Sequence, residues 1–283
     1  MKLERQILNS VVFGLALTLL LVSGITTLAQ DSMTGDEILE RVDEQQEKIS
    51  EGDVLSILKF ENVNSDGTKS NYKFGSLAKR EPGEPNYSLI YYLEPEDVAG
   101  SIFLSRDTEE NGSEMWLMLS AFPQPKKLPA SERQGSFAGS NLTFQEIGNR
   151  NMSERYDAEL VEETELTIDD ESVPAYLIET SVKEDATAKY PRSKVWVGKE
   201  NWLILKSEDR NEDGQMARIL EVEELEAFEG KTVTEKLTAE NVLDESATTV
   251  TFEKRERPEK EIPTSLFGPD QLKEFDPEEW GIK

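Results

Sequence analysis

A run of five apolar residues followed by three prolines is the feature that most limits the fold of this chain. Residues 115–119 read MWLML, which is too short for a free-standing helix and predicts a strand covered on both faces. Pro123, Pro125 and Pro129 follow, and each removes a backbone donor and fixes φ. We therefore expect a deeply buried strand that ends in an ordered, irregular loop over residues 123–136.

Aromatic residues return after this loop, among small ones. Phe137, Leu142 and Phe144 are interleaved with Gly139 and Ser140, a mixture that lets rings and backbone pack closely. On pattern alone, the stretch from Glu114 to Ile147 is a proline-broken crossover between two core strands.

Short strand patterns separated by turn residues fill most of the remaining chain. A capping box at Thr34 and Glu37 predicts one helix over residues 36–49. The expected strands cover residues 54–60, 69–77, 88–93, 102–104, 115–119, 175–180, 193–197, 202–207, 217–222 and 248–254. This order predicts an α+β fold with a strongly curved antiparallel sheet, whose apolar concave face is covered by helices, loops or a ligand.

Several motifs in this framework resemble the LolA-like outer-membrane lipoprotein-sorting proteins. Supporting segments are residues 87–104 and 194–222, so the resemblance covers most of the chain after residue 33. The positions that carry it are Trp116, Pro123, Lys126, Lys127, Phe137, Gly139, Ser140, Phe144, Glu146 and Ile147. The chain departs from the family pattern at Ala138, Asn141, Leu142 and Phe144, where Met, Asp, Phe and Tyr are usual, and it has lysines where the basic pair is commonly arginine.

The resemblance implies an unclosed β-barrel with a helix-roofed cavity for acyl chains. We expect Trp116 and Met118, which share one face of their strand, to line this cavity with Phe137 and Phe144, while Met115 faces the other way. The full set of candidate lipid-binding residues is Phe60, Phe74, Tyr91, Phe103, Trp116, Met118, Phe137, Phe144, Trp196 and Trp202. Each of them, taken singly, is also compatible with an ordinary core.

Three cations cluster near the prolines of this acidic chain. Lys126, Lys127 and Arg133 are candidates for contact with an acidic partner or with the polar head of a cargo. The alternative is ion pairing with the protein's own carboxylates.

The N-terminal residues have the pattern of a secretory signal. Lys2 and Arg5 precede an apolar run, and Thr27 and Ala29 are small residues suited to cleavage after Ala29. We expect residues 1–29 to be a signal peptide and residues 30–283 to be a single periplasmic lipid-carrier domain with a short charged C-terminal tail. An uncleaved membrane anchor is the alternative, because no charged residue occurs between Gln6 and Gln30.

Composition excludes many functions. The chain has no His and no Cys, which excludes His-based triads, Cys nucleophiles, zinc sites built on these residues, and lipidation of the chain itself. No spacing among the 58 acidic residues singles out a carboxylate pair, so we expect neither catalysis nor a cofactor or metal. A net charge of −27 argues against binding nucleic acid or anionic headgroups and is also compatible with a saline habitat.

Two stretches imitate the start of a calcium loop. Residues 62–67 and 209–214 have the opening spacing of an EF-hand, but Lys73 and Leu220 stand where a bidentate carboxylate is needed. Hairpin turns are the preferred interpretation. The acidic residues between Glu159 and Glu171 indicate a solvated face and a turn.

Together these features predict a monomeric, non-enzymatic carrier that shields the acyl chains of lipids or lipoproteins. Its expected partners are an inner-membrane transporter and an outer-membrane acceptor. Two alternatives remain open at this point: an accessory that hands hydrophobic cargo to or from a membrane exporter, and an envelope-stress sensor that uses the same fold.

Overall fold

One antiparallel sheet of 13 strands organises the protein. The structure is a computed structural model that describes residues 33–81, 83–108, 112–148 and 151–283. The order across the sheet is β6-β5-β4-β3-β2-β1-β13-β12-β11-β10-β9-β8-β7, so β6 and β7 form its two edges and the barrel stays unclosed. Residues 33–283 form one compact unit, and the expected signal segment lies outside the described residues.

The strands follow chain order apart from one junction, where β1 pairs with β13. Their bounds are β1 Gly52–Val63, β2 Lys69–Arg80, β3 Tyr87–Glu94, β4 Ile102–Thr108, β5 Gly112–Leu119, β6 Phe122–Lys127, β7 Tyr156–Ile168, β8 Glu171–Val182, β9 Arg192–Gly198, β10 Ile204–Arg210, β11 Met216–Phe228, β12 Lys231–Asn241 and β13 Ser246–Glu256. The helices are α1 Gly35–Ser50, α2 Phe144–Gly148 and the 3-10 turns η1 Ala130–Glu132, η2 Thr264–Phe267, η3 Pro269–Glu274 and η4 Glu278–Trp280.

The turns and the first helix confirm the sequence-based expectations. The capping box is present, because the Glu37 amide donates to Thr34 Oγ1 at 3.2 Å and the Thr34 amide donates to Glu37 Oε2 at 2.7 Å. Both calcium-like stretches are hairpin turns, in which the amides of Gly67 and Gly214 donate to the carbonyls of Asn64 and Asn211.

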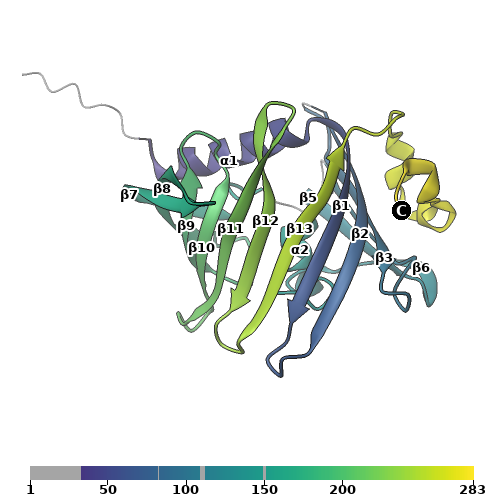
Figure 1. Cartoon of the computed structure of the whole chain (residues 1–283), viewed down its shortest axis with the longest axis horizontal. Helices are drawn as coiled ribbons and strands as arrows, with labels where there is room; N and C mark the ends of the chain where they lie inside the picture. Colours follow the sequence, from purple (N-terminus) through teal and green to yellow (C-terminus); the bar gives the residue numbers. More distant parts are fainter. Residues whose placement is uncertain (1–32, 82, 109–111, 149–150) are drawn as a thin grey trace, which may run out of the picture. The chain divides into compact units, whose positions relative to one another are not determined.

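The two faces of the sheet carry different covers (Figure 1). Its inner face is covered by α1 and by the plug segment, residues 128–148, which includes α2. Its outer face, over β1 to β5, is covered by the C-terminal tail, residues 262–282. The tail was expected to be a short charged end, but Phe267, Leu272 and Ile282 are each 1% exposed and pack on the sheet.

Three further expectations were wrong in detail. The proline segment forms an edge strand, β6, because Pro123 and Pro125 fall at the register shift opposite Leu117 and Leu119. The acidic stretch after Tyr156 forms the other edge strand, β7, although its charges are exposed and the turn at Asp169 and Asp170 is present. Strand β12 was missed altogether.

Candidate functional site

The inner face of β1 to β4 holds a cluster of aromatic rings around one residue of the plug segment. Phe137 is 1% exposed, and its ring centroid lies 5.4 Å from Phe74, 5.6 Å from Phe103 and 5.6 Å from Phe144. Phe60 is 5.9 Å away in an edge-on arrangement. Such ring pairs add to the hydrophobic burial of each side chain, so this half of the concave face is firmly filled.

A tight turn brings Phe137 into this cluster. Ser136 bridges Thr143, and Ala138 and Gly139 at the turn have φ values of 50° and 71°. Glycine adopts this backbone region at no cost, whereas Ala138 is strained there. Thr143 then starts α2 with a second capping box, in which its amide donates to Glu146 Oε2 at 2.8 Å.

Asn141 fixes the tip of the plug segment to the sheet. Its side-chain amide donates to the carbonyls of Ala239 at 3.1 Å and Ser246 at 3.0 Å, and its backbone amide donates to Thr248 Oγ1 at 2.9 Å. Asn62 adds a hydrogen bond to the carbonyl of Ala138 at 3.1 Å. The tip is therefore bound to β1, β12 and β13 in a single register.

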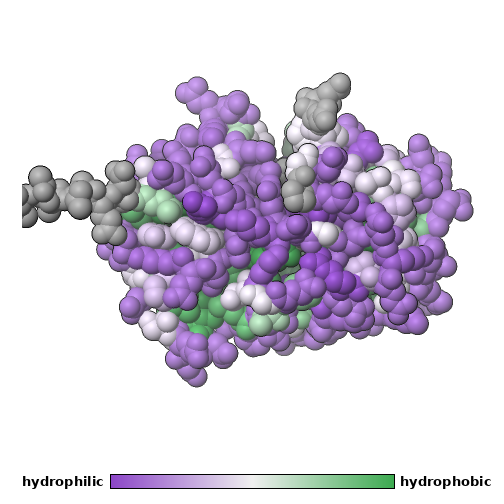
Figure 2. Space-filling model, turned by 90° about the horizontal axis from the view of Figure 1, so that it is seen from above, coloured by the Kyte–Doolittle hydropathy of each residue, from purple (hydrophilic) through white to green (hydrophobic). Residues whose placement is uncertain are grey.

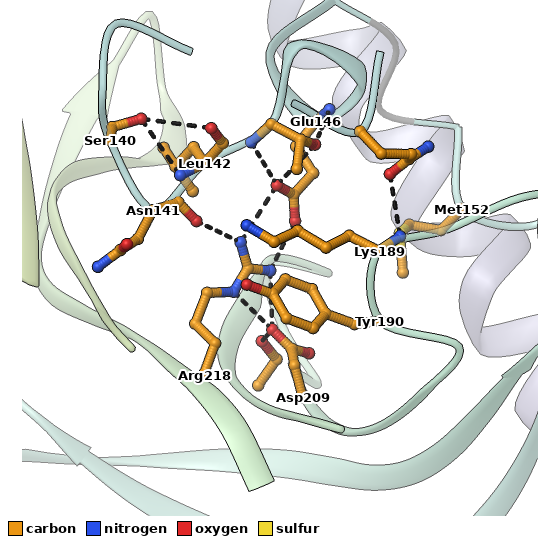
Figure 3. A network of polar contacts seen from close by, with 12 residues as sticks. Ser140, Asn141, Leu142, Glu146, Met152, Lys189, Tyr190, Asp209 and Arg218 are labelled. Carbon is orange, nitrogen blue, oxygen red and sulfur yellow. Dashed lines mark hydrogen bonds and ion pairs between the residues drawn. The ribbon is translucent and has the colours of Figure 1, made fainter. Parts of the chain in front are cut away.

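A buried arginine ties the other end of the plug segment to β10 and β11 (Figure 3). Arg218 is 4% exposed and donates to Glu146 Oε1 at 2.6 Å, to Asp209 Oδ2 at 2.8 Å and to the Asn141 carbonyl at 2.9 Å. Its guanidinium also lies 4.4 Å from the centre of the Tyr190 ring. One cation with two carboxylates makes a fully bonded network at the lower end of the inner face.

The proton equilibria of this network follow from burial and charge. Burial alone would raise the pKa of Glu146, but Arg218 and the hydrogen bonds from Thr143 outweigh it and hold that pKa below its usual value. Burial raises the pKa of Tyr190 to about 12. Burial and the neighbouring Arg218 lower the pKa of Lys189, whose side chain lies beside the network.

The other half of the inner face lies under α1. Ile38, Leu39 and Val42 of the helix pack in one cluster with Val195 and Val197 of β9. Spacings of one, three and four residues put these helical side chains on a single face. Helix α1 thus covers one part of the concave surface, and the plug segment packs into another part.

Between these two covers, the inner face keeps apolar side chains that are only partly buried. Leu220 of β11, Leu237 of β12 and Phe252 of β13 belong to this strip, and Leu237 pairs in register with Val222 and Val250. Seen from above, apolar surface is visible at the centre of the molecule between polar side chains (Figure 2). We call Leu220, Leu237 and Phe252 the inner strip.

The structure separates the predicted lipid-binding residues into groups. Phe60, Phe74, Phe103 and Phe137 meet on the inner face with Phe144, but these four rings are each at most 2% exposed and pack as core. Contrary to expectation, they therefore do not line a lipid cavity. Trp202 stacks on Tyr176 with centroids 5.8 Å apart, and Lys206 lies over the ring of Trp196 at 5.5 Å.

The prediction that Trp116 and Met118 lie on the same face as Phe137 and Phe144 was wrong. Trp116 and Met118 lie on the outer face in the cluster made with the tail, whereas Met115 lies on the inner face beside Phe137. Alternation along β5 correctly divided these side chains into two sets, but it does not say which set faces inward. Tyr91 also lies on the outer face.

The three cations do not form one cluster of free charges. Lys127 pairs with Glu114 and lies 5.5 Å from the centre of the Trp116 ring, so the expectation of pairing with the protein's own carboxylates is confirmed for this residue. Neighbouring residues of a strand point to opposite faces, which separates Lys126 from Lys127. Arg133 has a buried Nε without a hydrogen-bond partner among the described residues.

Sequence reasoning missed the roles of Arg218, Asp209 and Glu146. The available signal was Arg218 itself, a basic residue among the apolar positions of an expected strand, nine residues after Asp209 and across a hairpin turn. Within the described ranges, we find no group of three or more acidic residues arranged to hold a metal ion.

Residues 84–274 match the profile of a family whose description is "uncharacterized protein". The chain belongs to this family. None of the curated proteins matches it by sequence. Solved structures extend the comparison to the fold, and three of them align with 84% of the chain.

A DUF1329 family protein from Desulfovibrio piger aligns over 97% of its own length, with a TM-score of 0.74 and 22% identity. A domain assigned as an outer membrane lipoprotein-sorting protein, from Vibrio parahaemolyticus, aligns over 98% of its length, with a TM-score of 0.74 and 18% identity. A LolA superfamily protein from Nitrosomonas europaea aligns over 99% of its length, with a TM-score of 0.64 and 18% identity. The chain therefore has the fold of these proteins, and the unclosed-barrel fold expected from the sequence resemblance is confirmed. No helix in the described part of the chain is both long enough and apolar enough to cross a membrane.

Proposed function

We propose that the protein is a non-enzymatic periplasmic carrier that binds acyl chains of lipids or lipoproteins on its inner face. The single observation that carries this proposal is the inner strip. In it, Leu220, Leu237 and Phe252 remain partly exposed although they lie on the concave, apolar side of the sheet. The fold shared with lipoprotein-sorting relatives supports the same function.

Acyl-chain binding at the inner strip needs little specific chemistry. Each methylene removed from water contributes about 0.8 kcal/mol, so one long chain gains on the order of 10 kcal/mol before ordering costs. The plug segment limits how far a chain extends downward, because Phe137 and the Arg218 network already fill that end. We infer that the chain lies between α1 and the plug segment, along β11, β12 and β13.

Arg255 offers a polar contact at the upper end of the strip. Its guanidinium lies 4.4 Å from the centre of the Phe252 ring and donates to the Thr234 carbonyl at 3.1 Å. It also pairs with Glu226. A cation held against an aromatic ring next to an apolar strip suits the polar head of an amphiphilic cargo.

The proposal includes export and removal of residues 1–29, with the mature chain starting at Gln30. N-terminal sequencing of protein from its own host should find Gln30 at the start. Recovery of the full-length chain from membranes would instead show that residues 1–29 are retained as an uncleaved membrane anchor.

The edge strand β6 is the proposed contact for a partner protein or a cargo headgroup. Lys126 is exposed and makes no ion pair with any described residue, whereas Lys127 is engaged by Glu114. Lys126→Glu should reduce cargo transfer to an acceptor membrane fraction and leave the melting temperature unchanged. Lys127→Glu is the matched variant, and equal losses of transfer and stability in both would show a structural role.

The direct test is to identify what the protein carries. Protein purified from its own host without detergent should release an acyl lipid on solvent extraction, at about one molecule per chain by mass spectrometry. After delipidation, it should take up a fluorescent long-chain fatty acid. Absence of both bound lipid and uptake would overturn the carrier proposal.

A further inference from the structure

A groove lined by both apolar and polar residues lies outside the concave face, between the β5–β6 hairpin and the C-terminal tail. It has a volume of about 870 Å³, which falls in the range of small-molecule sites. Its floor is a row of three side chains on adjacent strands, because Tyr91 pairs in register with Ile102 and Ile102 pairs with Met118. These residues face away from the inner strip, so the groove is separate from the site proposed above.

The walls of the groove come from two segments distant in sequence. Leu272 and Phe275 of the tail form one wall, and the Phe275 ring lies 5.7 Å from Tyr91. The opposite wall is the hairpin, where Phe122 is 74% exposed. An aromatic side chain so exposed beside a groove gains contacts when the groove is filled.

The charge of the groove differs from that of the rest of the protein. Although the chain has 58 acidic residues, none of the twelve described residues that line the groove is acidic, and Lys273 is its one charged side chain. Asp276, just beyond the lining, is close enough to contribute with burial to a raised pKa of Tyr91. The neighbouring groove around Lys79 and Arg257 is different, because acidic and basic side chains are mixed along it.

We propose that this outer groove binds one single-chain amphiphile with an anionic head, such as a long-chain carboxylate. The alkyl chain lies over Tyr91 between Phe122 and Phe275, which are the accessible apolar side chains of the groove, and the carboxylate lies near Lys273. Size favours one alkyl chain over a folded partner, and Lys273, the one charged residue among the described residues of the lining, favours an anionic head.

The test uses the full chain and a photoreactive palmitate that carries a diazirine in its alkyl chain. After irradiation and proteolysis, label is expected in peptides that contain residues 118–124 and 272–275. Label in peptides of β11, β12 and β13 reports on the inner strip instead, so the two sites succeed or fail separately. Label confined to those strands would overturn the outer site.

Variants at the groove sharpen the result without touching buried residues. Phe122→Asp should weaken palmitate labelling of the outer groove about tenfold, because an exposed aromatic wall is replaced by a charge that repels the carboxylate. Leu243→Asp is the matched control, since Leu243 is an exposed apolar residue in the β12–β13 turn and should leave labelling unchanged. Equal labelling in Phe122→Asp and the unaltered protein would contradict the proposal.

Lys273→Glu tests the headgroup. It should lower labelling by palmitate roughly two- to fivefold, as expected for a partly exposed charge pair. The same variant should not change labelling by the corresponding diazirine alcohol, which has no charge. An equal loss with both probes would show that Lys273 shapes the groove and does not recognise the anionic head.

Discussion

The plug segment and the C-terminal tail cover opposite faces of the same strands in different ways. The plug segment is fixed by directional contacts, which include the hydrogen bonds of Asn141 to β12 and β13 and those that Arg218 of β11 donates to Asn141 and Glu146. The tail packs mainly through apolar side chains such as Phe267 and Ile282, with a hydrogen bond from the Ile262 amide to Asp53. Hydrogen bonds thus hold the plug segment in one register, whereas the tail is held mainly by the fit of apolar side chains against the sheet.

This difference bears on the proposed binding of acyl chains at the inner face. A hydrogen-bonded plug leaves a defined boundary at one end of the inner strip, because displacing it would leave buried polar groups without partners. Small shifts of the tail leave no buried polar group without a partner, because its contacts are mainly apolar. We therefore expect changes in the plug segment to cost more than matched changes in the tail.

The largest effect is expected from removing the buried arginine. Arg218→Met leaves Asp209 and Glu146 without their cation and should lower the free energy of unfolding by about 3–5 kcal/mol. The control is Arg257→Met, because the Arg257–Glu229 pair is more exposed, so solvent screens it and the loss of stability should be much smaller. Urea unfolding measures both, and equal losses would remove the distinction between the two kinds of contact.

Truncating one phenylalanine on each face compares the two covers directly. Phe137 and Phe267 are both 1% exposed, so each change to Ala should cost about 3–5 kcal/mol. Phe137→Ala should lie at the upper end, because four ring contacts of Phe137 described above are lost together. A larger loss for Phe267→Ala would mean that the tail is the principal cover.

Acid should release the plug segment before the tail. The folded-state pKa of Glu146 is lowered, so its contribution to stability is present above the unfolded pKa of about 4.3 and is lost as the pH falls through the folded value. The protection factors of the Phe144 and Ile147 amides, which correct for the slower intrinsic exchange in acid, should therefore fall below about pH 4. Glu146→Gln should remove this pH dependence, and an unchanged profile in that variant would assign it to another carboxylate.

The smallest effect is expected where the tail approaches the sheet. A Cβ added at Gly75 would lie 2.1 Å from Ile282 Cγ2, so Gly75→Ala must push the end of the tail outward. We expect a loss of about 1–3 kcal/mol and faster proteolysis near Trp280, while the ring cluster on the inner face stays unchanged. Near-ultraviolet circular dichroism and limited proteolysis distinguish local loosening from general unfolding.

Local patterns predicted a large part of this structure. The capping box at Thr34 and the hairpin turn after Asn64 depend on residues close in sequence. The rings around Phe137 were expected to line a cavity, but they come from distant strands and pack against one another as core. The strongly polar strand β12 escaped notice because threonines and charges occupy most of its positions.

The faces of the sheet could not be assigned from alternation alone. Trp116 and Met118 turned out to face the tail, since apolar residues that cover the outer face arrive from the far end of the chain. Ile262, Phe267 and Leu272 are spaced five residues apart, which matches neither the helical nor the strand period, so neither pattern marks them. The Arg218 network depends likewise on contacts between residues 72 positions apart.

Binding of a fluorescent long-chain fatty acid to two matched variants tests the central claim most directly. Leu237 and Ile219 lie on adjacent strands, both partly buried, with Leu237 on the inner strip and Ile219 on the outer face. If acyl chains bind the inner strip, Leu237→Asp in a chain that also carries Phe122→Asp, which weakens the outer groove, abolishes the saturable fluorescence increase in a protein that still folds, because a carboxylate in an apolar site is costly. Ile219→Asp in the same background binds as the chain with Phe122→Asp alone does. Equal binding by both variants would contradict the account.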